Sequence, residues 1–208
     1  MQTAVFSASQ ARLSNKLMLN VGGITPFTTI DFPGCIAAVI FCQGCSWRCS
    51  YCHNQHLLAV QTDAPVPWEQ VMEFLQSRKE LLDGIVFSGG EPTMQPALPE
   101  AMQVVRDCGY KVGLHTSGAY PETLEKCLPL LDWVGMDLKA SFEDYEQITG
   151  VVGSGELARK SAELVRYSGV AHLFRTTLDP FVQQNGRLEK MQQMVWEWGS
   201  GLVLQEIR

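Results

Sequence analysis

The chain has 208 residues, of which 46% are hydrophobic and 18% are charged, and its formal net charge is −6. This length and composition predict one globular domain, residues 17–208, preceded by a polar extension at residues 1–16. The basic residues are scattered, which argues against a nucleic-acid partner. No apolar run reaches the roughly 18 residues that would indicate a membrane span.

From residue 17 onward, short apolar runs alternate with amphipathic segments. Residues 17–34 contain several glycines and prolines and are predicted to form short extended pieces and turns. After them, apolar runs typical of strands buried on both faces alternate with segments that have apolar residues at helical spacing. The predicted strands are residues 36–41, 84–87, 111–116, 133–138, 171–178 and 202–207. The predicted helices are residues 68–82, 98–108, 121–131, about 157–165, and 188–198.

This alternation predicts an α/β fold. Six strands joined through helices imply parallel βα units with right-handed crossovers. A closed barrel of eight such units usually takes about 250 residues, so this chain has room for six. We therefore expect an open, partial (β/α)6 barrel with a cleft along its side. Reactive groups are expected at the carboxyl ends of its strands.

The most specific pattern is a cluster of cysteines directly after the first predicted strand. Cys45, Cys49 and Cys52 have the spacing C-x-x-x-C-x-x-C. Three thiolates within eight residues can hold one compact metal centre, and a cubane iron–sulfur cluster takes four ligands. Three cysteines therefore leave one iron open to a ligand that is not protein. The odd total of seven cysteines favours a reducing cytoplasm over a disulfide framework.

Cys42 extends this pattern to four cysteines and leaves other interpretations open. A zinc ribbon needs two cysteine pairs separated by roughly 15–20 residues, far more than the separation here. A ferredoxin run has its gaps in another order. We expect Cys42 to be a buried residue at the end of a strand, because free cysteine packs as a small hydrophobe. If it were a fourth ligand, the cluster would be closed and could only carry electrons.

The cysteine motif, with an aromatic residue before its last cysteine, resembles that of the radical S-adenosylmethionine (SAM) superfamily. The resemblance implies a [4Fe-4S] cluster on the three cysteines, with SAM chelating the open iron. It assigns Tyr51 and His53 to the adenine side of the SAM site. The Gly-Gly-Glu-Pro element after the second predicted strand resembles the loop that binds the SAM amino group. That likeness implies a SAM-binding role for Ser88, Gly89, Gly90 and Glu91.

Two further elements are similar to those of the activating enzymes of glycyl radical enzymes. Asp137-Leu138-Lys139 resembles a D-L-K element in which both polar residues line the SAM site and the aspartate joins a monovalent-cation site. The partner element, usually D-T-N-G, is His115-Thr116-Ser117-Gly118 here. The missing carboxylate puts the cation site in doubt, although Thr116 still offers a hydroxyl. Arg175 could pair with the SAM carboxylate or form a structural salt bridge.

The resemblance runs from about residue 17 to the end of the chain. It is strongest to the single-cluster activating proteins of anaerobic ribonucleoside-triphosphate reductase. It implies reductive cleavage of SAM, with flavodoxin or ferredoxin as the electron donor, and removal of a hydrogen atom from a glycine of a partner glycyl radical enzyme. The alternatives are a short radical SAM enzyme acting on a small molecule, such as a 7-carboxy-7-deazaguanine synthase, and an electron-transfer module.

The T-x-D-x-P-G element before the first predicted strand, residues 29–34, also resembles one in these activating enzymes. We expect the partner's glycine loop to bind beside Asp31 and Gly34, along the open side of the barrel. Pro33 fixes its own φ and Gly34 has no side chain, so a foreign backbone could run close to them. A plain turn is the other interpretation of this element.

Overall fold

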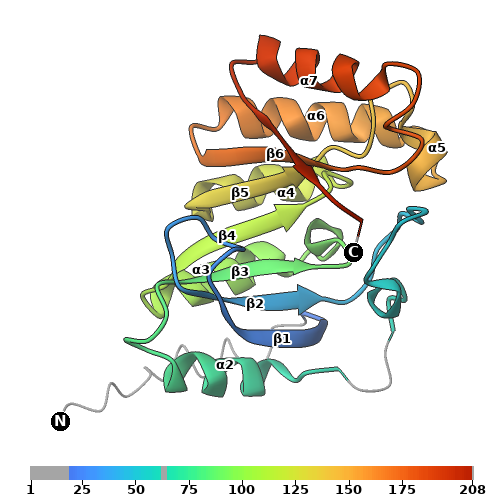
Figure 1. Ribbon diagram of the computed structural model, residues 1–208. Helices are drawn as coiled ribbons and strands as arrows, with labels where there is room; N and C mark the ends of the chain where they lie inside the picture. Colours follow the sequence, from blue (N-terminus) through green and yellow to red (C-terminus); the bar gives the residue numbers. More distant parts are fainter. Residues whose placement is uncertain (1–18, 62–64, 208) are drawn as a thin grey trace.

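The fold is organised by a sheet of seven strands in the order β1-β2-β3-β4-β5-β6-β7, in a computed structural model that describes residues 19–61 and 65–207 (Figure 1). The strands are β1 (Val21–Thr28), β2 (Ala37–Cys42), β3 (Gly84–Gly89), β4 (Lys111–Thr116), β5 (Trp133–Asp137), β6 (Ala171–Thr177) and β7 (Leu202–Gln205). From β2 to β7 every pairing is parallel, as predicted, whereas β1 runs antiparallel to β2. The predicted extension at residues 1–16 lies outside the described residues.

The helices follow the sequence prediction in number and order, with one addition. They are α2 (Trp68–Ser77), α3 (Leu98–Asp107), α4 (Pro121–Cys127), α5 (Tyr145–Thr149), α6 (Ser154–Tyr167) and α7 (Arg187–Glu197). Three single turns of 3-10 helix accompany them, η1 (Gln55–Leu57), η2 (Pro92–Met94) and η3 (Leu128–Leu130). The helix α5 was not predicted. Across residues 19–61 and 65–207, no helix is long and apolar enough to cross a bilayer.

Two helices end earlier than predicted. The helix α2 stops at Ser77 instead of residue 82, and Glu80 beyond it has a positive φ of 75°, which a right-handed helix does not accommodate. The helix α4 gives way to η3 after Cys127, because Pro129 has no N–H to continue the helical hydrogen bonds. Apolar spacing alone therefore overestimates the length of both helices.

The strand β1 corrects the prediction of short extended pieces for residues 17–34. It is one strand of eight residues, but its register against β2 shifts between Val21 and Gly23 and again between Thr25 and Thr28. Such bulges break the alternation of inward and outward side chains. The interrupted alternation explains why this strand is hard to recognise in the sequence.

The two faces of the sheet have different neighbours, and β2 shows the division residue by residue. Ala38, Ile40 and Cys42 belong to the large core on the side of the helices. Ala37 and Val39 belong to a smaller cluster on the opposite, inner face. Because side chains alternate along a strand, the last residue of β2 points under the helices.

The sheet is curved into an open partial barrel, as predicted. The turn after β1 and the end of β7 belong to opposite edges of the sheet, yet both line the same cavity. Phe32, from the turn between β1 and β2, fills the inner face below this cavity. Its ring stacks on Trp133 with centroids 6.0 Å apart. A Cβ added at Gly84 would lie only 2.8 Å from that ring, so the glycine gives Phe32 its place.

Candidate active site

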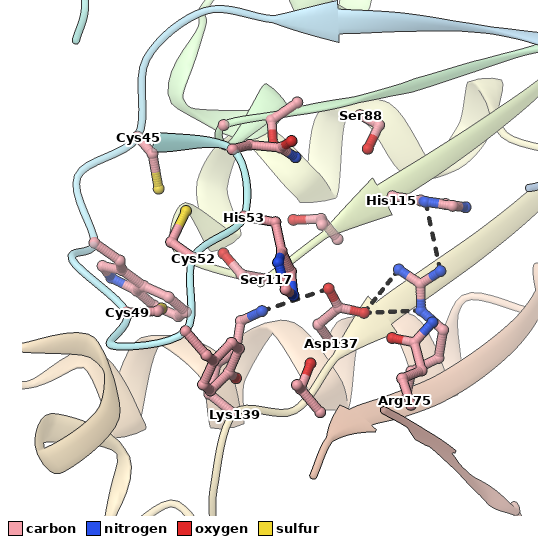
Figure 2. Close-up of a pocket in the computed structure, with 18 of the residues that line it drawn as sticks. Cys45, Cys49, Cys52, His53, Ser88, His115, Ser117, Asp137, Lys139 and Arg175 are labelled. Atoms are coloured by element: carbon pink, nitrogen blue, oxygen red, sulfur yellow. Dashed lines mark hydrogen bonds and ion pairs between the residues drawn. The ribbon is translucent and has the colours of Figure 1, made fainter. Parts of the chain in front are cut away.

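The carboxyl ends of the parallel strands surround a cavity of about 780 Å³ (Figure 2). Ligand sites in parallel α/β folds form at this end of the strands. The cavity brings together almost all of the predicted site residues. They are Asp31, Cys45, Cys49, Tyr51, Cys52, His53, Ser88, Gly89, Gly90, Thr116, Asp137, Lys139 and Arg175. The two exceptions are Glu91, which is fully buried, and Gly34, which lies exposed in the turn after β1.

The cysteines are carried by a long loop after β2, which is held in place at both of its ends. The N–H groups of Gly44 and Cys45 donate to the carbonyls of Leu57 and Leu58, at 2.8 and 3.2 Å. The side chain of Gln43 donates to two further carbonyls in the returning part of the loop. These bonds close the loop at its base, so its cysteines face the cavity from a defined position.

The tip of the same loop is anchored to the opposite side of the barrel. Trp47 is buried and meets the ring of Tyr145 edge-on, with centroids 5.7 Å apart. The N–H of Arg48 donates to the carbonyl of Thr149, at 2.9 Å. The unpredicted helix α5 therefore supports the cysteine loop.

The three cysteines have the properties expected of iron ligands. Cys45, Cys49 and Cys52 are free thiols, partly exposed to the cavity (Figure 2). Burial raises the pKa of the Cys45 thiol to about 11 and also raises the pKa of Cys49. Thiolates at these positions therefore need a nearby positive charge, which cluster iron supplies when it is bound.

Cys42 lies elsewhere. It has no exposed surface, does not line the cavity, and burial strongly raises the pKa of its thiol. In the described part of the chain, no three His, Cys, Asp or Glu side chains converge as the ligands of a single ion would. Three cysteines on the wall of a wider space suit a cluster that takes one cysteine at each of three irons.

The Gly-Gly-Glu loop after β3 is packed tightly against the base of the cysteine loop. The N–H groups of Gly90 and Glu91 donate to the carbonyls of Cys42 and Gly44, at 2.9 and 2.8 Å. A Cβ added at Gly90 would lie 2.2 Å from the carbonyl oxygen of Gly44. Two adjacent glycines can leave room for a ligand beside their backbone. Around Gly90 that room is taken by the protein's own backbone, which joins the two loops.

Glu91 ties the same loop to the end of β4. One carboxylate oxygen accepts hydrogen bonds from the N–H and hydroxyl of Thr93 and from the hydroxyl of Thr116, at 3.0, 2.6 and 2.7 Å. The other accepts from the N–H of Ser117, at 2.8 Å, and from its hydroxyl. The carboxylate is thus saturated by protein donors, and Glu91 positions the loop from behind the cavity wall.

A cluster of charged side chains stands opposite the cysteines, with Asp137 at its centre (Figure 2). Arg175 donates to one oxygen of Asp137 through Nε and Nη2, at 2.8 and 2.7 Å. Lys139 Nζ lies 3.4 Å from the other oxygen. Arg175 Nη1 also lies 3.4 Å from Nδ1 of His115, and His115 Nε2 lies 2.8 Å from the carbonyl oxygen of Asp31.

The charges in this cluster follow from mutual contact. Burial raises the pKa of Asp137, but the cations Arg175 and Lys139 outweigh it and lower that pKa below its usual range. Burial lowers the pKa of Lys139, but interactions with Tyr51 and Asp137 raise it well above the ordinary value. Burial and the charge of Arg175 lower the pKa of His115 to about 4. Near neutral pH the cluster therefore holds one anion, two cations and a neutral imidazole.

Several cavity residues had no assigned role in the sequence prediction. Trp47, Asn54 and Leu58 come from the cysteine loop, and Ser117 and Thr177 follow or end strands. Residues 203–206, from the end of β7, form part of the side wall. Thr177 and the residues of β7 could have been predicted to line the cavity, because they lie at or near the carboxyl ends of predicted strands. Nothing in the sequence pattern marks Trp47, Asn54 or Leu58 as cavity residues.

Comparisons with known proteins agree with this geometry. The family model described as the radical SAM superfamily matches residues 39–187. A protein of Methanocaldococcus jannaschii, whose name describes a glycyl-radical enzyme activating enzyme, is 32% identical over 185 residues, covering 84% of this chain and 75% of that protein. The pyruvate formate-lyase-activating enzyme of Clostridium pasteurianum is 32% identical over 140 residues, covering 64% of this chain and 58% of that enzyme.

Solved structures share the fold at lower identity. QueE from Escherichia coli aligns over 96% of this chain and 99% of its own, with a TM-score of 0.55 and 14% identity. The protein anSMEcpe with bound AdoMet aligns over 80% of this chain and 49% of its own, with a TM-score of 0.63 and 16% identity. Such low identity shows the fold alone. The family match and the cysteine-lined cavity together establish that the chain belongs to the radical SAM superfamily of enzymes, which use a [4Fe-4S] cluster and SAM.

Proposed function

We propose that this enzyme activates a glycyl radical enzyme by removing a hydrogen atom from a backbone glycine of that partner. The observation that carries the proposal is a cysteine-lined cavity bounded by both edges of an open sheet. A cavity with this opening suits a substrate that is a loop of another protein. The names of the two relatives, from Methanocaldococcus jannaschii and Clostridium pasteurianum, support the same activity.

The residues of the cavity divide into two groups in this proposal. Cys45, Cys49 and Cys52 would hold the [4Fe-4S] cluster, which together with SAM and an external electron donor would supply the reductive cleavage of SAM. A second group surrounds SAM and excludes water from the radical. That group comprises Tyr51, His53, Ser88, Gly89, Gly90, Thr116, Asp137, Lys139 and Arg175, with Glu91 behind the wall.

The rim of the opening supplies the surface for the partner. Ile30, next to Asp31, is 74% exposed although it lines the cavity, and Val203 and Leu204 of β7 are 42% and 41% exposed. Exposed apolar side chains on both rims fit a protein surface better than a small polar substrate. Gly34 is exposed in the turn that carries Asp31, with nothing within 4 Å of a Cβ placed there, so a partner's backbone could approach it.

The partner is anaerobic ribonucleoside-triphosphate reductase in our proposal, and the electron donor is flavodoxin or ferredoxin in the cytoplasm. The test is anaerobic. The protein, reconstituted with iron and sulfide, is mixed with SAM, reduced flavodoxin and the purified reductase. We expect an EPR doublet on the reductase that requires all components and is absent with Cys49→Ala. SAM cleavage without any radical on the reductase, or on other glycyl radical enzymes, would favour the small-molecule alternative.

A further inference from the structure

The charged cluster does not fit the monovalent cation that the D-L-K resemblance implies. Both oxygens of Asp137 already face protein cations, Arg175 at 2.7 and 2.8 Å and Lys139 at 3.4 Å. A hard cation needs several oxygen ligands. At position 115 the chain offers imidazole nitrogens, which contact Arg175 and the Asp31 carbonyl.

The fold makes room for the guanidinium of Arg175 at this point. Asp137 and Arg175 are direct partners in the parallel register of β5 and β6, and His115 is paired with Gly135 on the other side of β5. A Cβ at Gly135 would lie 2.6 Å from Trp133 and 3.3 Å from the Arg175 Cζ. The missing side chain at Gly135 therefore lets Arg175 reach across β5 to His115.

We propose that the guanidinium of Arg175 is the resident monovalent cation of this SAM site, so that the enzyme binds SAM without Na⁺ or K⁺. Arginine is always charged in proteins, and its planar group of N–H donors here contacts Oδ1 of Asp137 through Nε and Nη2 and His115 through Nη1. His115 occupies the position where the D-T-N-G element has its aspartate. Its Nδ1 lies 3.4 Å from Nη1, the guanidinium nitrogen that does not contact Asp137. The cluster keeps one net positive charge, from Arg175 and Lys139 against Asp137, next to the cysteine loop.

This inference rests on membership of the radical SAM superfamily and on SAM binding. It does not depend on activation of a glycyl radical enzyme, so the two proposals can fail separately. The readout is equilibrium binding of SAM to the cluster-loaded protein, with no partner or electron donor present. Binding is compared in KCl, NaCl and tetramethylammonium chloride at equal ionic strength, which removes general screening as a cause.

The wild-type protein should bind SAM with the same affinity, within about twofold, in all three salts. Arg175→Met should weaken SAM binding about tenfold or more, because the site then loses the proposed resident cation and Oδ1 of Asp137 loses its charge-assisted hydrogen bonds. Arg175→Lys should retain most of the affinity and its independence of salt. The double variant His115→Asp with Arg175→Met offers two carboxylates, and its SAM affinity should rise about tenfold in KCl relative to tetramethylammonium.

Arg106→Met is the matched control, because Arg106 pairs with Asp132 at 2.9 Å on an exposed surface away from the cavity. It should behave as the wild type does. Iron content and melting temperature are checked for every variant. Wild-type affinity that falls about tenfold on removal of Na⁺ and K⁺ would overturn the proposal. So would unchanged, salt-independent binding in Arg175→Met, or a folded, cluster-bearing double variant without any response to K⁺.

Discussion

At the scale of single residues, the four clustered cysteines have two different fates. Cys45, Cys49 and Cys52 line the cavity, while Cys42, one residue from the start of the same loop, is sealed under the helices. The alternation along β2 causes this difference, because Ile40 and Cys42 share the outer face. Sequence spacing left both a three-ligand and a four-ligand site open. Burial favours three ligands.

This division predicts different outcomes for alanine variants. Cys45→Ala, Cys49→Ala and Cys52→Ala should each lose the cluster and reductive SAM cleavage. Cys42→Ala should retain wild-type iron and sulfide content and most activity, with a small loss of stability from the removed buried sulfur, about 1 kcal/mol. Iron and sulfide analysis after anaerobic reconstitution distinguishes these results. A cluster-free Cys42→Ala protein that is otherwise folded would contradict the three-ligand site.

His115 predicts a pH effect on stability. Its pKa in the folded protein is about 4, against an ordinary 6.5, so the unfolded chain binds more protons between these values. The contribution of neutral His115 to the free energy of unfolding is therefore fully present above about pH 6.5, and it is lost as the pH falls toward 4. Linkage gives a loss of about 1.3 kcal/mol between pH 7.5 and 5.5, or roughly 3–5 °C in melting temperature.

The matched variant is His115→Gln, which cannot titrate in this range. Its melting temperature should decrease less over the same pH interval than that of the wild type. The comparison isolates one group, because the other titrating side chains are common to both proteins. If the melting temperatures of the two proteins decreased equally with pH, His115 would not be held neutral in the fold.

At the scale of elements, the site is assembled where one loop docks on another. The Gly-Gly-Glu loop donates two backbone hydrogen bonds to the base of the cysteine loop, and Gly90 fits only because it has no side chain. The motif is local in sequence, but its partner is the loop after a different strand. Its role in docking the loops was therefore not visible before the structure was known.

We predict that Gly90→Ala, which adds a single methyl group, disturbs both cluster binding and SAM binding. The added methyl would lie 2.2 Å from the Gly44 carbonyl oxygen, so the two loops must separate, at a cost of about 1–3 kcal/mol or more. Iron content after reconstitution and the melting temperature should both decrease. Gly23→Ala is the control, since nothing lies within 4 Å of a Cβ at that position. Full iron content with weakened SAM binding would instead indicate that the space at Gly90 serves the ligand.

At the scale of the whole molecule, the proposed function depends on separating SAM cleavage from attack on a partner. Asp31 lies in the cavity wall on the turn after β1, where its carboxylate accepts a hydrogen bond from the Thr28 hydroxyl at 2.6 Å. Asp31→Ala should slow glycyl radical formation by roughly 10- to 150-fold, the effect of losing one charge-assisted hydrogen bond. SAM cleavage with dithionite alone should continue. Equal losses in both assays would assign Asp31 to the SAM site or to the fold.

The parallel part of the fold was predictable because buried strands and apolar helix stripes are local patterns. The bulged strand β1 and the five-residue helix α5 were not, since neither repeats a pattern long enough to recognise. The salt bridge between Arg175 and Asp137 was one of two alternatives for that arginine. Only the register of β5 against β6 makes them neighbours, and the sequence does not contain that register in readable form.

The open sheet also affects the tendency of the protein to aggregate. In the part of the chain that the structure describes, β7 pairs with β6 alone, and it exposes Val203 and Leu204. On the other edge, a bridge from Val66 covers β1 at Val21. An unshielded apolar edge strand is a template for pairing with other chains, which many proteins block with charge, proline or a covering segment. If the opening admits another protein, as proposed, it cannot be blocked in this way, and the free enzyme should then be more prone to aggregate through β7 than the enzyme with its partner docked.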